Sequence, residues 1–386
     1  MSETTVVTNA RVVTRTGVVD GSVAFEDGRI IEVSARHFAD GFDVNGALLM
    51  PGVVDAHTDY IEKEISPRPG AEVSLEMAMH MMDLRALACG LTTVLSGARI
   101  THERSGPAGT WHEGMYLARE IQQRAPRMRA RHRVHVRWDT RYTPIDDNIA
   151  ELCSMDGIGN LVFNDSMPGV RQYRDMDELV RKQALRLNIS IEASRALMDE
   201  KVQAALAVDN RAATAAALKG RFPLGSHDDT TVEHVDEAFA LGATLCEMPV
   251  TIEAARRAKE LGMLVCMGAP NYVRGGSHCG NLAAHEAFAE GLVDMLCSDY
   301  HFPSLLASAV LMVASGESPS RVAELLALNP ARHLGVDAEL GSIEIGKLAD
   351  LVAFHPREGY ADVTCTWVGG RLQFAAHDAR AALAAR

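Results

Sequence analysis

Several short apolar runs along the chain end in side chains that can bind a metal ion. His57 and Asp59 end the first of these runs two positions apart, so in a strand both point to the same side. Imidazole and carboxylate groups together suit Zn²⁺, Mn²⁺ or a similar divalent ion. One or two ions are expected, Zn²⁺ first, with Mn²⁺ or iron as alternatives. The predicted ligands are His57, Asp59, Asp139, His227 and Asp299, and the run ends also offer Asp165 and Glu247 as supporting residues or further ligands.

Each of these residues has an ordinary explanation when it is taken alone. A single His-x-Asp occurs by chance in many proteins, and a lone histidine such as His227 is more often hydrogen-bonded than metal-bound. An aspartate after a strand often caps the next helix, as expected for Asp229. The prediction therefore depends on the joint pattern, in which all five ligands stand at the same level of one fold.

The fold that would bring them together is a barrel. Eight apolar runs alternate with amphipathic segments that are typical of helices, within about 260 residues, which favours a closed (β/α)₈ barrel. Active sites of such barrels lie where the strands end. A doubly wound open sheet is the alternative, but no glycine-rich phosphate fingerprint follows the first run. The predicted strands are 53–59, 92–97, 133–139, 160–165, 222–227, 243–248, 263–269 and 293–299.

Both chain ends differ from this middle part. Residues 4–34 and 342–374 alternate in short β-rich pieces separated by turn residues. They predict a small β-sandwich domain, residues 1–50 and 340–375, that brackets a barrel of residues 51–339. Residues 376–386 are interpreted as a C-terminal tail.

Composition narrows the class of protein. The 386 residues are 47% hydrophobic and 23% charged, which is typical of a soluble globular protein. A formal charge of −13 argues against nucleic acid as a partner, because that binding neutralises phosphates. The most apolar stretch, residues 305–314, is about half a membrane span. Seven cysteines without a CxxC pair and an N-terminus unlike a signal peptide favour a cytoplasmic protein, and a homo-oligomer is left open.

Two loops are candidate anion sites. Arg68 lies in a rigid Ser-Pro-Arg-Pro-Gly loop after the first strand. The segment 268–281 after the seventh strand is rich in glycine, and a helix is expected to start near Asn281. Backbone N–H groups and a helix N-terminus favour an anion there. The predicted substrate-binding residues are Arg68, Arg274, Ser277 and His278.

The motifs resemble a known superfamily. The runs LLMPGVVDAHTD and LNPARHLG…GSIEIGKLADLVAF resemble the amidohydrolase superfamily, in which a small β-sandwich brackets a metal-binding barrel. HTDYIEKEISPRPG, SHDDTT and GAPNYVRGGSHCGN are similar to its phosphonate-metabolism branch. The resemblance implies metal ligands at His57, Asp59 and His227, a bridging acid at Asp139 and a strand-eight acid at Asp299. The branch more usually has Glu at the position of Asp139 and a His-Thr-Pro-Gly-Gln type of run at 166–170, and other superfamily members often have His at the position of Glu247.

These observations predict a metal-dependent hydrolase. Asp299 would orient or deprotonate a metal-bound water. The resemblance implies that the substrate is a small anion, a ribose-phosphonate triphosphate whose phosphoanhydride is split to release pyrophosphate. The alternative is hydrolysis of a C–N bond in a cyclic amide, an N-acyl amino acid or a dipeptide, since the fold does not separate the two chemistries. A non-catalytic scaffold is a further rival, but none of the five ligands is missing.

Overall fold

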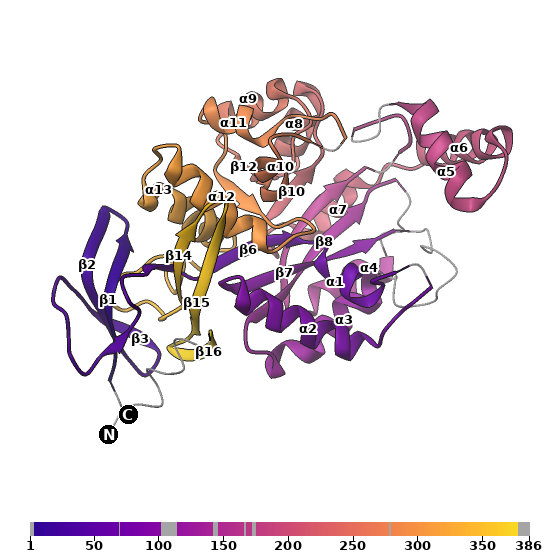
Figure 1. Ribbon diagram of the computed structural model, residues 1–386. Coiled ribbons are helices and arrows are strands. Elements are labelled where there is room, and N and C mark those ends of the chain that lie inside the picture. The colour runs from indigo at the N-terminus through magenta and orange to yellow at the C-terminus, as the bar shows by residue number, and fades with distance from the viewer. Residues whose placement is uncertain are drawn as a thin grey trace.

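Eight parallel strands form the central sheet of the computed structural model, which describes residues 4–68, 70–101, 114–141, 146–165, 167–171, 175–277 and 279–376 (Figure 1). They pair in chain order from β6 to β13, and a parallel bridge between Thr58 and Asp299 joins the last strand to the first. The predicted (β/α)₈ barrel is thereby confirmed. The strands are β6 (Val53–Thr58), β7 (Leu91–Ile100), β8 (Arg131–Asp139), β9 (Ile158–Asn164), β10 (Leu224–His227), β11 (Leu245–Glu247), β12 (Leu264–Gly268) and β13 (Met295–Cys297).

Helices follow each strand and cover the barrel with their apolar faces. Hydroxyl side chains begin several of them: Ser74, Thr231 and Thr251 each accept a backbone N–H of the first turn. The prediction that Asp229 caps the next helix is wrong, because Thr231 does so. The helices are α1 (Tyr60–Ile65), α2 (Leu75–Ala88), α3 (Gly114–Arg124), α4 (Asp146–Cys153), α5 (Met176–Leu187), α6 (Ile191–Leu206), α7 (Arg211–Leu218), α8 (Val232–Ala240), α9 (Ile252–Glu260), α10 (Ala269–Arg274), α11 (Ala284–Ala289), α12 (Pro303–Ala314), α13 (Pro319–Ala323) and α14 (Asn329–His333).

The segment after strand β12 differs from its prediction. Residues expected to form a glycine-rich loop instead begin with α10, which has Pro270 in its first turn, where a missing N–H costs nothing. Gly275 ends that helix in the left-handed conformation, with φ of 73°. The next helix, α11, begins at Ala284 rather than near Asn281. Arg274 is therefore the last residue of a helix and not part of a loop.

Both chain ends join in one further sheet, which lies beside the barrel in Figure 1. β5 pairs antiparallel with β14, so that N-terminal and C-terminal strands share one ladder. This sheet has a core cluster of its own, which includes Phe42 and Trp367, whose rings meet edge to face at 5.5 Å. Its strands are β1 (Thr5–Thr14), β2 (Gly17–Glu26), β3 (Arg29–Ser34), β4 (Phe42–Asp43), β5 (Leu48–Pro51), β14 (Leu351–Arg357), β15 (Tyr360–Val368) and β16 (Arg371–Ala375).

The barrel itself is filled by side chains from the strands and the surrounding helices. Trp138, Phe302 and Met82 are among its largest fully buried side chains. Burial of apolar area on this scale is the main favourable term in folding. Among the described residues, no helix is long and apolar enough to cross a membrane.

Candidate active site

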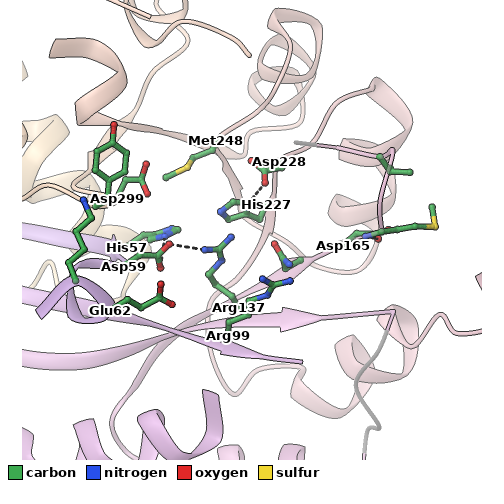
Figure 2. A pocket seen from close by; sticks show the side chains of 15 residues that line it. His57, Asp59, Glu62, Arg99, Arg137, Asp165, His227, Asp228, Met248 and Asp299 are labelled. Atoms are coloured by element: carbon green, nitrogen blue, oxygen red, sulfur yellow. Dashed lines mark hydrogen bonds and ion pairs between the residues drawn. The ribbon is translucent and has the colours of Figure 1, made fainter. Parts of the chain in front are cut away.

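A cavity of about 440 Å³ opens where the barrel strands end (Figure 2). Its lining is strongly polar, and it combines imidazole, carboxylate and guanidinium groups from six different strands or the turns that follow them. The lining residues are His57, Asp59, Glu62, Lys63, Arg99, Arg137, Asn164, Asp165, Met167, Val170, His227, Asp228, Met248, Asp299 and Tyr300.

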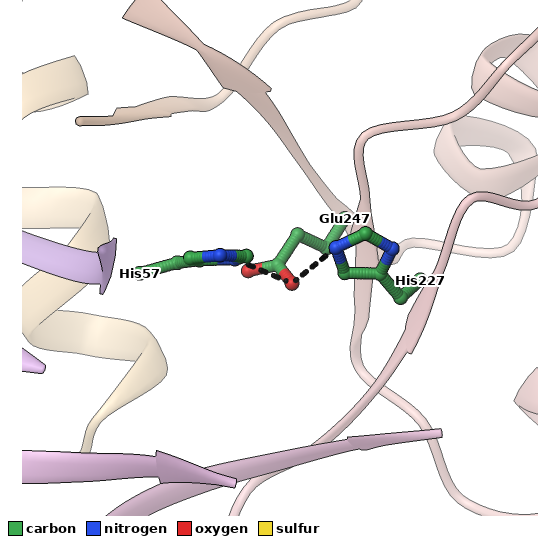
Figure 3. Close-up of side chains that lie close together, drawn as sticks. All are labelled: His57, His227 and Glu247. Atoms are coloured by element: carbon green, nitrogen blue, oxygen red, sulfur yellow. Dashed lines mark ion pairs between the residues drawn. The ribbon is translucent and has the colours of Figure 1, made fainter. Parts of the chain in front are cut away.

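Glu247 stands between His57 and His227, two histidines that line the cavity (Figure 3). Glu247 Oε2 lies 2.9 Å from Nδ1 of His57 and 3.6 Å from Nε2 of His227. All three side chains are buried. Both oxygens of Glu247 and Nε2 of either histidine lack a hydrogen-bond partner. Buried polar groups are rarely left unpaired, and this donor set is one that a divalent ion would satisfy.

A second group lies nearer the mouth of the cavity. Ligand atoms of His57, Asp59 and Asp299 lie within 4.8 Å of one another. The backbone holds them there, because Asp299 N–H donates to the carbonyl of His57 at 3.2 Å and Asp59 N–H donates to the carbonyl of Asp299 at 2.6 Å. The two candidate metal groups therefore share His57.

Burial and neighbouring charges shift the pKa values of the carboxylates in both groups. Burial acts to raise the pKa of Glu247, but His57 and His135 outweigh it and hold the pKa well below its usual range. Burial likewise acts to raise the pKa of Asp59, which Arg137 and His57 hold below its usual range. Asp299 behaves differently, since burial raises its pKa and the nearby His57 offsets only part of the effect. Of the two carboxylates in this group, Asp299 is thus the one that takes up a proton more readily.

The structure brings four of the five predicted ligands together, namely His57, Asp59, His227 and Asp299, and adds Glu247 to them. Asp139 belongs to neither group among the described residues. Its carboxylate accepts the backbone N–H of Arg141 at 3.1 Å and lies 3.9 Å from Arg99. Asp165 lines the cavity but is paired with Arg141 at 3.0 Å.

The sequence analysis missed three groups around the same site, of which His135 and Asp55 are buried and Arg137 is partly buried. His135 of β8 directs Nε2 toward Glu247 Oε2 at 3.4 Å. Arg137, two residues later on the same face, donates to Asp59 at 2.9 Å. Asp55 of β6 accepts the backbone N–H of Ser298, and burial raises its pKa to about 7. Strand periodicity could have found them, because each lies an even number of residues before a predicted ligand.

The cations of the cavity are also different from those predicted. Lys63, Arg99 and Arg137 line it. Arg68 and Arg274 are exposed and lie outside its lining. Ser277 lines a smaller adjoining cavity, which shares Asp299 with the main one. His278 lies outside the described residues.

A buried ion pair ties one wall of the cavity to the strand that carries His227. Arg171 donates to the carboxylate of Asp229 at 2.5 Å and to the carbonyl of His227 at 3.2 Å. Met167 and Val170, which precede Arg171, line the cavity. This contact joins the segment that contains Met167 and Val170 to the strand that carries His227.

The amidohydrolase family matches residues 176–373 of the chain. The chain belongs to this family and is a hydrolase, as its barrel and strand-end imidazole and carboxylate groups led us to expect. Its resemblance extends further to one relative, alpha-D-ribose 1-methylphosphonate 5-triphosphate diphosphatase of Escherichia coli strain K12. The two are 34% identical over 382 residues, which cover 96% of this chain and 100% of the relative. The predicted membership of the phosphonate branch is thereby confirmed.

More distant proteins share the fold. Imidazolonepropionase of Symbiobacterium thermophilum is 25% identical over 86% of this chain and 83% of its own. Crystal structures of N-acetylglucosamine-6-phosphate deacetylase from Pasteurella multocida and dihydropyrimidinase from Brevibacillus agri superpose with TM-scores of 0.60 and 0.61. Both matches cover 96% of this chain. The deacetylase is covered over 100% of its own chain at 14% identity, and the dihydropyrimidinase over 95% at 15% identity. These structures share the overall fold of the chain.

Proposed function

We propose that the enzyme hydrolyses a phosphoanhydride bond of a ribose-phosphonate triphosphate and releases pyrophosphate. The observation that carries this proposal is the end-to-end similarity to the diphosphatase of E. coli. The cavity supports it, because Lys63, Arg99 and Arg137 lie beside the two metal groups. We further propose that the enzyme acts in the cytoplasm, on a small anionic substrate.

The residues of the site support a division of labour. We propose Zn²⁺ as the ion, with Mn²⁺ or iron as alternatives, and when bound it would lower the pKa of a coordinated water. Asp299 would serve as the base that takes up a proton at its carboxylate, in line with the raised pKa of that group. Arg137 faces the cavity from its floor, where its guanidinium can hold phosphate oxygens while it orients Asp59. Arg274, Arg68, Ser277 and His278 remain proposed contacts for the outer phosphates.

Charge balance links the substrate to the metal. Five acidic and three basic side chains line the cavity, so without an ion it repels a polyanion. Divalent ions on His57, Glu247, Asp59 and Asp299 would reverse that balance. A triphosphate therefore requires the metal for binding as well as for catalysis.

One observation favours a second candidate, hydrolysis of a C–N bond in a neutral cyclic amide. The acidic excess of the cavity would not repel a neutral substrate, and dihydropyrimidinase shares the fold. Since metal chemistry is common to both reactions, only the substrate separates them.

The test is a product assay on the purified enzyme. Release of pyrophosphate is followed with a ribose-phosphonate triphosphate and with a nucleoside triphosphate, while ring opening is followed with hydantoin and dihydrouracil. We expect pyrophosphate from the phosphonate substrate, loss of activity after chelation, and recovery when Zn²⁺ or Mn²⁺ is restored. Ring opening without pyrophosphate release would move the assignment to C–N hydrolysis.

A further inference from the structure

The barrel closes between its first and last strands with little backbone pairing. Every other pair of neighbouring barrel strands shares at least three paired residues. Between β6 and the end of β13, the described residues share a single bridge, Thr58 with Asp299. Two backbone hydrogen bonds flank it, from Asp299 N–H to the carbonyl of His57 and from Asp59 N–H to the carbonyl of Asp299. The position of Asp299 therefore also depends on the side chains at this seam.

Side chains supply further hydrogen bonds across the seam. Asp55 Oδ1 accepts the backbone N–H of Ser298 at 2.9 Å. Ser298 Oγ donates to Thr58 Oγ1 at 2.8 Å, and Thr58 Oγ1 donates to the carbonyl of Asp299 at 3.0 Å. Asp55, Thr58 and Ser298 are fully buried. Two side chains of β6 thus hold both Ser298 and the residue that follows it, Asp299.

Asp299 needs such support because its backbone is left-handed. Its φ is 54°, a value that residues with a side chain adopt uncommonly. Conformations of this kind persist where the surrounding contacts impose them, and they cluster at active sites. The carboxylate of Asp299 must also stay within reach of His57 and Asp59, whose ligand atoms lie within 4.8 Å of it. A shift of the backbone at Ser298 would move this carboxylate relative to both residues.

Stability alone does not account for a carboxyl group at position 55. Within the described part of the chain, Oδ2 of Asp55 is buried and lacks a hydrogen-bond partner. Burial of a polar oxygen without a partner costs free energy, and native proteins rarely leave one in this state. Exceptions of this kind are expected mainly at functional sites. The other oxygen of Asp55 contacts the residue directly before Asp299, which indicates a role at the active site.

We propose that Asp55 is a positioning residue for Asp299. By accepting the N–H of Ser298, it fixes the left-handed backbone from which the Asp299 carboxylate reaches His57 and Asp59. Asp55 is absent from the lining of the cavity, so it acts through Ser298 and not on the substrate. This inference rests on the proposed role of Asp299 as the base, and it does not depend on the identity of the substrate.

Asp55→Leu and Asp55→Asn test this role, because leucine removes the acceptor and asparagine keeps it. Each protein is freed of metal and loaded with Co²⁺, whose visible absorption reports the geometry of its ligands. Asp55→Leu should change the Co²⁺ spectrum and lower kcat for pyrophosphate release about 10–100-fold, the usual effect of losing a contact behind a metal ligand. KM should change little, since the cations Lys63 and Arg99 lie elsewhere in the cavity. Asp55→Asn should restore both the spectrum and kcat.

Asp83→Leu is the matched control. Asp83 is another buried carboxylate that accepts backbone N–H groups, those of Arg129 at 3.1 Å and Ala130 at 3.0 Å. It lies outside the lining of the catalytic cavity. Asp83→Leu should therefore unfold at lower urea concentration but keep the Co²⁺ spectrum and kcat of the parent protein.

Thr58→Val provides a second variant if Asp55→Leu does not fold. It removes the hydroxyl that bonds to both Ser298 and Asp299 and changes the side-chain volume little. We expect an altered Co²⁺ spectrum and a lower kcat here as well. A folded Thr58→Val protein that keeps both would contradict the proposal, because the backbone alone would then hold Asp299.

Three results with the other variants would overturn the proposal. The first is a folded Asp55→Leu protein with the Co²⁺ spectrum and kcat of the parent. The second is an Asp55→Asn protein as impaired as Asp55→Leu, since the hydrogen bond would then not be the cause. The third is an equal loss of kcat in Asp83→Leu, which would make the effect one of stability. Failure to release pyrophosphate from any triphosphate would instead reject the proposed substrate, while the Co²⁺ spectra would still test Asp55.

Discussion

The ion pair between Arg171 and Asp229 should matter for both stability and turnover. Asp229 is fully buried and Arg171 nearly so. Removing one partner of a buried pair costs about 3–5 kcal/mol, because the other charge stays buried without compensation. Asp229 would keep its contacts with Ser226 Oγ and with Cys246 Sγ. For Arg171→Met we therefore expect the lower end, a loss of about 3 kcal/mol in the free energy of unfolding.

Turnover should fall as well, since Arg171 positions the wall that contains Met167 and Val170. Displacement of substrate-positioning groups by about 1 Å can cost on the order of 100-fold in rate. The assay is a double-mutant cycle of Arg171→Met and Asp229→Asn, measured by urea unfolding and by kcat/KM for pyrophosphate release. The matched control is Arg195→Met, which breaks an exposed pair with Asp177 and should cost under about 1 kcal/mol.

A loss of less than about 1 kcal/mol in the free energy of unfolding of Arg171→Met, or additive effects of the two substitutions, would contradict this role of the ion pair. Contacting residues in one network show coupling of about 0.5–3 kcal/mol, so additivity would mean that the pair does not act as a unit. Unchanged kcat/KM in a correctly folded variant would separate the wall from catalysis.

Three further predictions concern the base, the phosphate contacts and pH. Asp299→Asn should fold, keep at least part of its metal and turn over about 100-fold more slowly, and an unfolded or fully active variant would contradict its role as base. Arg274→Ala and Arg99→Ala should both weaken pyrophosphate inhibition if both hold phosphates, and an effect confined to Arg99→Ala would restrict binding to the cavity. Burial opposes the depressed pKa of Asp83, but hydrogen bonds from His132 and from two backbone N–H groups outweigh it. Asp83 thus stabilises the fold above its unfolded pKa of about 3.9 and stops doing so as the pH falls through its folded pKa. In urea unfolding, Asp83→Asn should therefore cost more at pH 7 than at pH 3, and an equal cost at both values would contradict the linkage.

The strand ends were predictable from the sequence because barrel strands carry strong periodic signals. The apolar run that ends in His57-Thr58-Asp59 predicts a strand, and the spacing of two residues predicts that His57 and Asp59 project from the same side of it. The segment after β12 was not predictable in the same way. Its glycines suggested an open loop, whereas the Ala269-Pro270 start of α10 is a weaker signal that only the packed structure reveals.

Some residues of the site were not predicted from the sequence, for a different reason. His135 lies inside its strand, and its significance depends on the register that places it opposite Asn160 and within reach of Glu247 from β11. Arg99 was overlooked because β7 continues to Ile100, past the predicted end at Gly97. Register between strands and the exact length of a strand are tertiary properties, so a single sequence gives little information about either.

Because the bridge between Thr58 and Asp299 joins the first and last strands of the barrel, the active site is complete only late in folding. Thr58 Oγ1 donates to the carbonyl of Asp299 across a separation of 241 residues, so Asp299 meets His57 and Asp59 only when the last strand docks against the first. At about 5–20 residues per second, the ribosome would need roughly 10–50 s to synthesise the chain between them. During that time His57 and its neighbours can pair with β7 on one side but lack the last strand on the other. In a refolding experiment, recovery of metal binding at His57, Asp59 and Asp299 would therefore report closure of the barrel, whereas circular dichroism would report the helices that form before it.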